Sequence, residues 1–112
     1  FFTVMNKLSN VLYQINRRDE LIFLNEEWEN FARDNDACFL LPENVLGKSL
    51  WDFITDATTV EIYREIIYQA RRGDFLRFNF RCYSPGRRRL LEMNVSAAEK
   101  EDVRFEIRTV ST

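Results

Sequence analysis

The last third of the chain alternates apolar and polar residues in three successive runs, and this pattern restricts the possible folds more than any other feature. The runs cover residues 75–83, 91–95 and 103–109. Alternation with a period of two residues indicates half-buried β-strands. Pro85 and Gly86 occupy the positions that a type II turn favours, and the polar segment 99–102 predicts a second turn. We therefore expect three antiparallel strands with one face turned to the core. The side chains on that face are Leu76, Phe78, Phe80, Cys82, Leu91, Met93, Val95, Val103, Phe105, Ile107 and Thr109.

The beginning of the chain predicts a β-hairpin followed by a helix. Residues 11–16 alternate, residues 21–24 are apolar, and the polar segment 17–20 between them is typical of a turn. Asn25 stands where the first helix should begin, because an asparagine side chain accepts hydrogen bonds from the first helical turn. The carboxylates that follow complement the positive end of the helix dipole; they are Glu26, Glu27 and Glu29.

The middle of the chain predicts the remaining helices. Ser49 can cap a single helical turn over residues 50–54. Thr58 and Glu61 match a capping box, so we expect a long helix that begins at Thr58 and ends at Gly73. The order is two strands, several helices and three strands. It predicts an α+β fold, in which a five-stranded antiparallel sheet carries helices packed on one face.

The composition excludes most catalytic and metal-binding machinery. The chain of 112 residues contains no histidine, two cysteines and three glycines. Without histidine there is no Ser/His/Asp or Cys/His nucleophilic pair, and no histidine-ligated haem or zinc. Three separate glycines do not form a phosphate-binding loop. We therefore expect no catalytic residue, no metal site and no enzyme activity.

The charge pattern and the hydropathy pattern restrict the partners. The net charge is −2, with no basic excess of the kind that binds nucleic acid. No apolar run reaches the length of a membrane span, and the beginning of the chain lacks the pattern of a signal peptide. We expect a single cytoplasmic domain with no nucleic-acid partner and no membrane partner.

The order of these elements, together with several short motifs, resembles the PAS sensor domain family. The matching segments are residues 13–16, residues 21–25 with Trp28 and Phe31 after them, residues 46–54, the long helix up to Gly73, residues 78–82 and the Ser84-Pro85 turn. The resemblance implies that residues 10–112 form a PAS-like domain and that residues 1–9 are a helical remnant of a flanking segment. It also implies a sensory module of a larger bacterial regulatory protein, coupled to an output domain.

The resemblance does not include the cofactor-binding motifs of the family. Haem-binding PAS domains usually use a histidine ligand, which this chain lacks. Flavin-binding PAS domains carry Asn-Cys-Arg-Phe-Leu-Gln on a helix, and Cys38-Phe39-Leu40-Leu41 matches it poorly. We therefore predict no cofactor and disfavour haem and flavin.

In PAS-like architecture, small ligands bind between the sheet and the helices. The side chains expected to line that space are Tyr13, Trp28, Phe78, Phe80, Met93 and Phe105. Bulky apolar side chains usually fill such a space by themselves. Two interpretations therefore stay open, namely a sensor that binds a small ligand there and a dimerisation module with a filled core and no ligand.

PAS-like domains commonly pack the other face of the sheet against a second subunit or a flanking helix. The apolar candidates for this contact are Phe2, Met5, Leu12, Leu90 and Val110. The same face carries charged residues of both signs, which predict cross-strand ion pairs. They are Arg77, Arg81, Arg104, Arg108, Glu92 and Glu106. We expect a homodimer that signals through dimer packing or flanking-helix packing.

Overall fold

The computed structural model describes residues 10–34, 38–84 and 87–111, with the backbone alone for residues 82–84, 87–89 and 111. These residues form one antiparallel sheet of five strands in the order β2-β1-β5-β4-β3. The strands are β1 (Val11–Ile15), β2 (Leu21–Leu24), β3 (Leu76–Ser84), β4 (Arg87–Ala97) and β5 (Val103–Ser111). The pairing of β1 with β5 joins the beginning of the chain to its end. The predicted α+β fold is confirmed.

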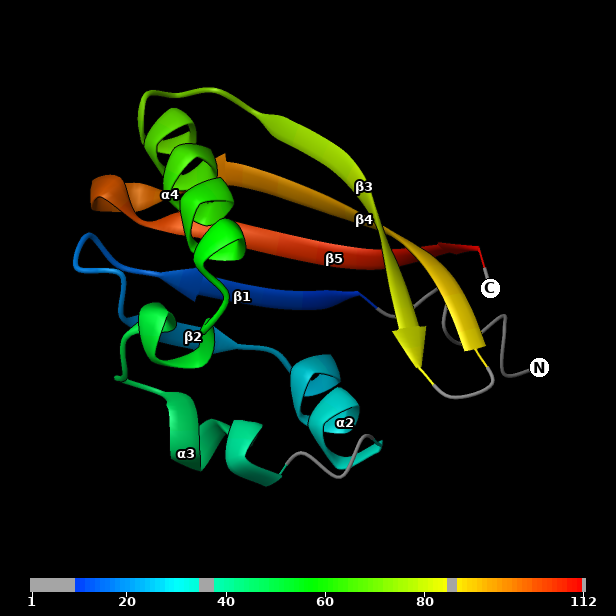
Figure 1. Cartoon of the computed structure of the whole chain (residues 1–112). Coiled ribbons are helices and arrows are strands. Elements are labelled where there is room, and N and C mark those ends of the chain that lie inside the picture. The colour runs from blue at the N-terminus through cyan, green and yellow to red at the C-terminus, as the bar shows by residue number, and fades with distance from the viewer. Residues whose placement is uncertain (1–9, 35–37, 85–86, 112) are drawn as a thin grey trace.

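The helices lie between β2 and β3 in the sequence. They are α2 (Glu26–Asp34), α3 (Pro42–Val45) and α4 (Ala57–Arg71), separated by the 3-10 turns η1 (Cys38–Leu40) and η2 (Leu50–Phe53). A third 3-10 turn, η3 (Glu99–Glu101), connects β4 to β5. Figure 1 shows α2, α3 and α4 on the same side of the sheet, with α4 crossing over the strands. We call the other side, which none of the described helices covers, the outer face.

Side-chain caps define where the helical segments begin. The Asn25 side chain accepts a hydrogen bond from the Trp28 backbone N–H at 3.1 Å, and Ser49 accepts one from Trp51 at 3.2 Å. Both predicted caps are therefore confirmed. The predicted capping box of α4 is wrong, because Asp56 and not Thr58 is its N-cap. A carboxylate two residues earlier is a stronger acceptor than the threonine hydroxyl, so the first helical residue is Ala57.

The core lies between the helix-covered face of the sheet and the helices. Tyr13 pairs with Phe105 and Phe105 pairs with Val95, so one buried row crosses three strands. The largest fully buried side chains are Phe105, Ile15, Leu21, Val45, Val95 and Val103. The alternation in β3, β4 and β5 therefore predicts the inward face correctly. The side chain of Cys82 and residues 1–9 lie outside the described residues.

Candidate functional site

Tyr13 is the centre of an aromatic cluster beneath the helices. Its ring stacks on Phe105 with centroids 4.6 Å apart and planes 9° apart, and it meets Trp28 edge-on at 5.3 Å. The Trp28 indole N–H donates to the Leu40 carbonyl oxygen at 2.6 Å, which fixes the ring between α2 and η1. Tyr13 therefore contacts two of the other predicted ligand-lining residues, Trp28 and Phe105.

A pair of tyrosine hydroxyls introduces polarity into this cluster. The hydroxyl oxygens of Tyr13 on β1 and Tyr63 on α4 lie 3.2 Å apart. Burial raises the pKa of Tyr13 well above its ordinary value, and burial also raises the pKa of Tyr63. Both side chains are thus neutral phenols. One hydrogen bond uses only one of their two protons, and neither hydroxyl makes a further hydrogen bond within the described residues.

The other three predicted lining residues lie further along the sheet. Met93 is buried and pairs with Phe78 across β3 and β4, while Phe78 and Phe80 are half-buried with ring centroids 6.4 Å apart. The prediction did not include Tyr63 among the lining residues, although its place in the apolar stripe of the long helix turns it inward. What the sequence lacks is any signal that its hydroxyl meets that of Tyr13, 50 residues away.

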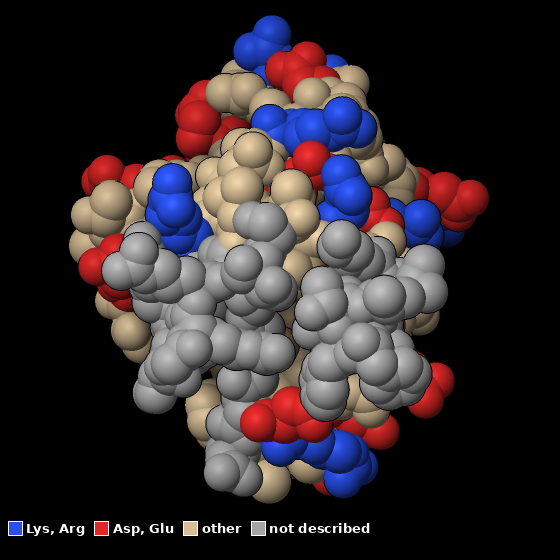
Figure 2. All heavy atoms as spheres, turned by 90° about the vertical axis from the view of Figure 1, so that its right-hand side faces the viewer, with Lys and Arg blue, Asp and Glu red and all other residues tan. Residues whose placement is uncertain are grey.

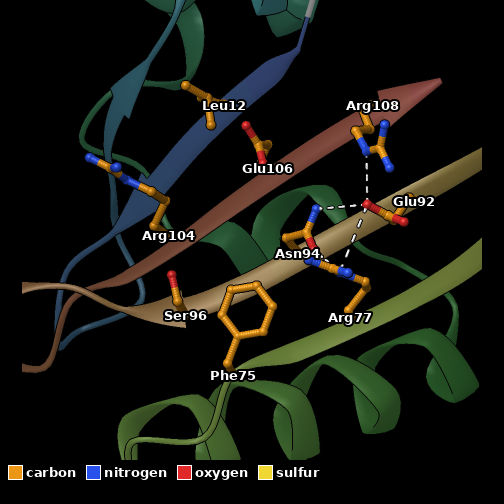
Figure 3. Close-up of a pocket in the computed structure, with 9 residues that line it drawn as sticks. All are labelled: Leu12, Phe75, Arg77, Glu92, Asn94, Ser96, Arg104, Glu106 and Arg108. Carbon is orange, nitrogen blue, oxygen red and sulfur yellow. Dashed lines mark hydrogen bonds and ion pairs between the residues drawn. The ribbon is translucent and has the colours of Figure 1, made fainter. Parts of the chain in front are cut away.

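The outer face of the sheet contains a hollow of about 380 Å³. Its residues come from β1, β3, β4 and β5 and from the loop before β3, and they are Leu12, Phe75, Arg77, Glu92, Asn94, Ser96, Arg104, Glu106 and Arg108. The register explains the arrangement, because Leu12, Glu106, Asn94 and Arg77 pair successively across four strands. Figure 3 shows these side chains on the side of the sheet away from the helices.

Glu92 organises the charges at one end of the hollow. Arg108 donates to its carboxylate at 2.8 Å, Arg77 lies 4.0 Å from the same oxygen, and the Asn94 amide donates at 3.2 Å (Figure 3). The hydrogen bond from Arg108 is the main reason that the pKa of Glu92 lies below its ordinary value. The predicted cross-strand ion pairs are confirmed for this group.

At the opposite end of the hollow, the polar side chains have fewer partners among the described residues. The side chain of Glu106 accepts a hydrogen bond from the Asn10 amide at 3.0 Å, but the Asn10 side-chain oxygen is buried with no hydrogen-bond partner. Arg104 is exposed and makes no ion pair within the described part of the chain. Figure 3 shows its guanidinium directed away from Glu92.

Three of the residues predicted for the outer-face contact lie within the described residues. Leu12 is half-buried in the hollow, Leu90 is half-buried, and Val110 is 37% exposed. Leu90 pairs with Arg81 on β3 and lies on the same face as Glu92. Val110 lies at a register shift between β4 and β5, where simple alternation does not apply. Phe2 and Met5 lie outside the described residues.

Charged side chains of both signs are interspersed at one end of the molecule. Figure 2 views one end of the molecule, where the described Lys and Arg side chains alternate with Asp and Glu around the margin. Within residues 10–34, 38–84 and 87–111, no three Cys, Asp or Glu side chains gather as a metal site would require. In the same residues, no helix is both long enough and apolar enough to cross a membrane.

The comparisons with known proteins identify the fold. No protein-family model matches the chain, and no curated protein sequence matches it. Fifteen chains of solved structures match, among them a sensory box sensor histidine kinase from Vibrio cholerae, with a TM-score of 0.63. That match covers 99% of this chain and 89% of the other chain at 14% sequence identity. The chain has a PAS-like fold. The PAS-like sheet is therefore the scaffold of both candidate sites, the aromatic cluster on its covered face and the hollow on its outer face.

Proposed function

We propose that this domain is a PAS-type regulatory module of a larger signalling protein, and that it acts by packing its outer face against a second copy of itself. The observation that carries the proposal is the uneven covering of the sheet. Among the described residues, α2, α3 and α4 lie on one side, while the other side keeps a hollow with a half-buried leucine, Leu12, at its wall. Apolar residues surrounded by polar ones are typical of protein interfaces.

The charges of the outer face suit a symmetric contact. A two-fold interface brings the same surface of both subunits together, so it needs both signs of charge within one patch. The hollow supplies three arginines and two glutamates. A rotation about an axis near the hollow would place Arg104, which makes no ion pair among the described residues, opposite the acidic part of the second copy. Signalling would then consist of a change in this packing, passed to an output domain.

Paired substitutions on the outer face test this proposal. We expect the unmodified protein to sediment as a dimer, and Leu12→Asp with Leu90→Asp to convert it to a monomer, because two carboxylates would be buried without partners. Ile62→Asp is the matched control, since Ile62 is 51% exposed on α4, on the opposite side of the sheet. A monomeric unmodified protein, or a dimer that keeps its mass in the Leu12/Leu90 variant, would show that the interface is elsewhere.

A second function, ligand sensing within the covered face, is favoured by the tyrosine hydroxyl pair. Buried polar groups are nearly always hydrogen-bonded, and the pair of Tyr13 and Tyr63 retains one hydroxyl proton without an acceptor within the described residues. An oxygen atom of a small, mostly apolar ligand would accept it. Such a ligand would signal only if it bound two states of the domain with different affinities.

Mass spectrometry under native and denaturing conditions tests the ligand directly. An adduct on the purified protein that is lost on denaturation supports sensing, and we expect Tyr13→Phe with Tyr63→Phe to reduce its occupancy. Tyr68→Phe is the control, because Tyr68 is an exposed tyrosine of the same helix as Tyr63. Equal occupancy in the double variant and the control would argue against a role of the hydroxyl pair.

A further inference from the structure

The two edges of the sheet differ in the backbone hydrogen bonds that they make with the rest of the described chain. At the β2 edge, the chain after α3 folds back onto Leu21, whose N–H donates to Lys48 at 2.9 Å and whose carbonyl accepts from Gly47 at 2.7 Å. Glu20 and Ser49 extend this contact as a bridge. At the other edge, β3 pairs with β4 only, and within the described residues no other backbone group donates to it or accepts from it.

The open edge of β3 is long and has two chemically distinct sides. It spans nine residues, and half of the N–H and C=O groups of an edge strand point away from its one neighbour. On the outer face, Arg77, Asn79 and Arg81 are exposed. On the helix-covered face, Leu76, Phe78 and Phe80 are half-buried against the margin of the core.

We infer that the edge of β3 binds an extended segment of a partner protein as an additional strand, in which acidic and apolar residues alternate. Addition of a strand satisfies the open backbone groups, and alternate side chains confer specificity. Acidic side chains of the segment would lie beside Arg77 and Arg81 on the outer face. Apolar side chains on its other side would cover Phe78 and Phe80 and extend the core.

The charges of β3 favour such a segment over a second copy of β3. The described part of the strand carries two outward arginines, and its sequence contains no acidic residue. Pairing of two β3 strands would gather four arginines on one face without a counter-charge from either strand, and like charges across a strand pair are destabilising. The Nε atom of Arg77 donates to Asn94 at 2.9 Å and lies 4.0 Å from Glu92, but the side chain is 64% exposed, so its two terminal nitrogens can donate to a further carboxylate.

The experiment compares two synthetic peptides of the length of β3, one alternating valine with glutamate and the other alternating valine with lysine. We expect the glutamate peptide to bind in a fluorescence anisotropy titration and the lysine peptide to fail. Hydrogen exchange should slow at alternate amides of β3, while amides of β2 should not change. Equal binding of the two peptides, or binding without protection of β3, would overturn the inference.

A charge-reversed pair of variants locates the contact. Arg81→Glu should weaken binding of the glutamate peptide about fivefold, since it replaces a favourable cross-strand pair by a repulsive one. Arg17→Glu is the matched control, because it makes the same charge change at an exposed residue of the turn between β1 and β2, away from the β3 edge. Similar losses in both variants would mean that the peptide responds to net charge alone. Self-association of the protein through β3, seen as protection of the same amides without peptide, would also refute the inferred partner.

Discussion

Arg71 and Asp19 form an ion pair that joins the last turn of α4 to the β1–β2 turn. The two side chains meet at 2.8 Å, and each is 23% exposed. The other carboxylate oxygen of Asp19 accepts from the Trp51 indole at 2.9 Å. Arg71 also donates to the carbonyl oxygens of Asn16 and Glu101 at 2.9 and 3.0 Å. Four segments that are distant in sequence are therefore held at one point, where the helices meet the end of the sheet.

Replacement of Asp19 should destabilise the domain. Asp19→Ala leaves the Arg71 guanidinium and the Trp51 N–H without their acceptor, and we expect a loss of about 2 kcal/mol in the free energy of unfolding. Asp19 also has a φ of 63°, which asparagine tolerates better than alanine, so Asp19→Asn should lose less. Urea denaturation measures both. Asp52→Ala is the control at an exposed aspartate nearby, and an equal effect there would contradict the role of Asp19.

The hydroxyl pair of Tyr13 and Tyr63 should show energetic coupling. Tyr63→Phe leaves the buried Tyr13 hydroxyl unpaired, Tyr13→Phe leaves the half-buried Tyr63 hydroxyl unpaired, and each should cost about 1 kcal/mol. The double variant should cost less than the sum of the two, because it removes both polar groups. A double-mutant cycle by chemical denaturation gives the coupling energy. Strict additivity would mean that the hydroxyls do not interact in solution.

Stability should decline at high pH because of the same pair. The pKa values of Tyr13 and Tyr63 are raised above 10.0 in the folded protein, so the folded state holds these protons more tightly than the unfolded state does. The stability that the two protonated tyrosines contribute is complete below about pH 10 and is lost as the pH rises toward the folded pKa values. We expect the alkaline decline to be shallower in the double Tyr→Phe variant. Tyr68→Phe, at an exposed position, should retain the decline of the unmodified protein.

The stability that the cap of α4 contributes should be lost at low pH instead of high pH. The backbone N–H and the hydroxyl of Thr59 donate to Asp56 at 2.9 and 2.8 Å, and these hydrogen bonds lower the pKa of Asp56 below 3.8. Asp56→Ala should reduce stability at neutral pH. The difference from the unmodified protein should shrink as the pH falls below 3.8 toward the folded pKa, because protonation removes the charged cap. Thermal denaturation against pH tests this, and a larger effect of Thr58→Ala would restore the predicted capping box.

The sequence predicts the strands well because their signal is local. Met93, Val95, Val103 and Phe105 alternate with polar residues, and each is buried as the alternation requires. The caps at Asn25 and Ser49 are also local, since each side chain reaches an N–H two or three residues away. The cap of α4 is predicted wrongly because two acceptors, Asp56 and Thr58, compete within three residues.

The candidate sites depend on contacts that local patterns do not encode. Tyr13 and Tyr63 are 50 residues apart, and Asp19 and Arg71 are 52 residues apart, so nothing in either segment identifies its partner. The alternation predicts that Arg77, Arg108 and Glu92 share a face. The strand register decides that both arginines reach the same carboxylate.

By itself, the sequence determined the five strands, the helical segments α2, η2 and α4, and the buried side of β1, β3, β4 and β5, because hydrophobic periodicity and capping act within a few residues. It also determined the absence of histidine chemistry. The tertiary structure alone decided which edge of the sheet is bound by another described segment and which is not. It also decided which hydroxyls and charges meet, because strand order and register bring together residues whose separation along the chain carries no record of their contact.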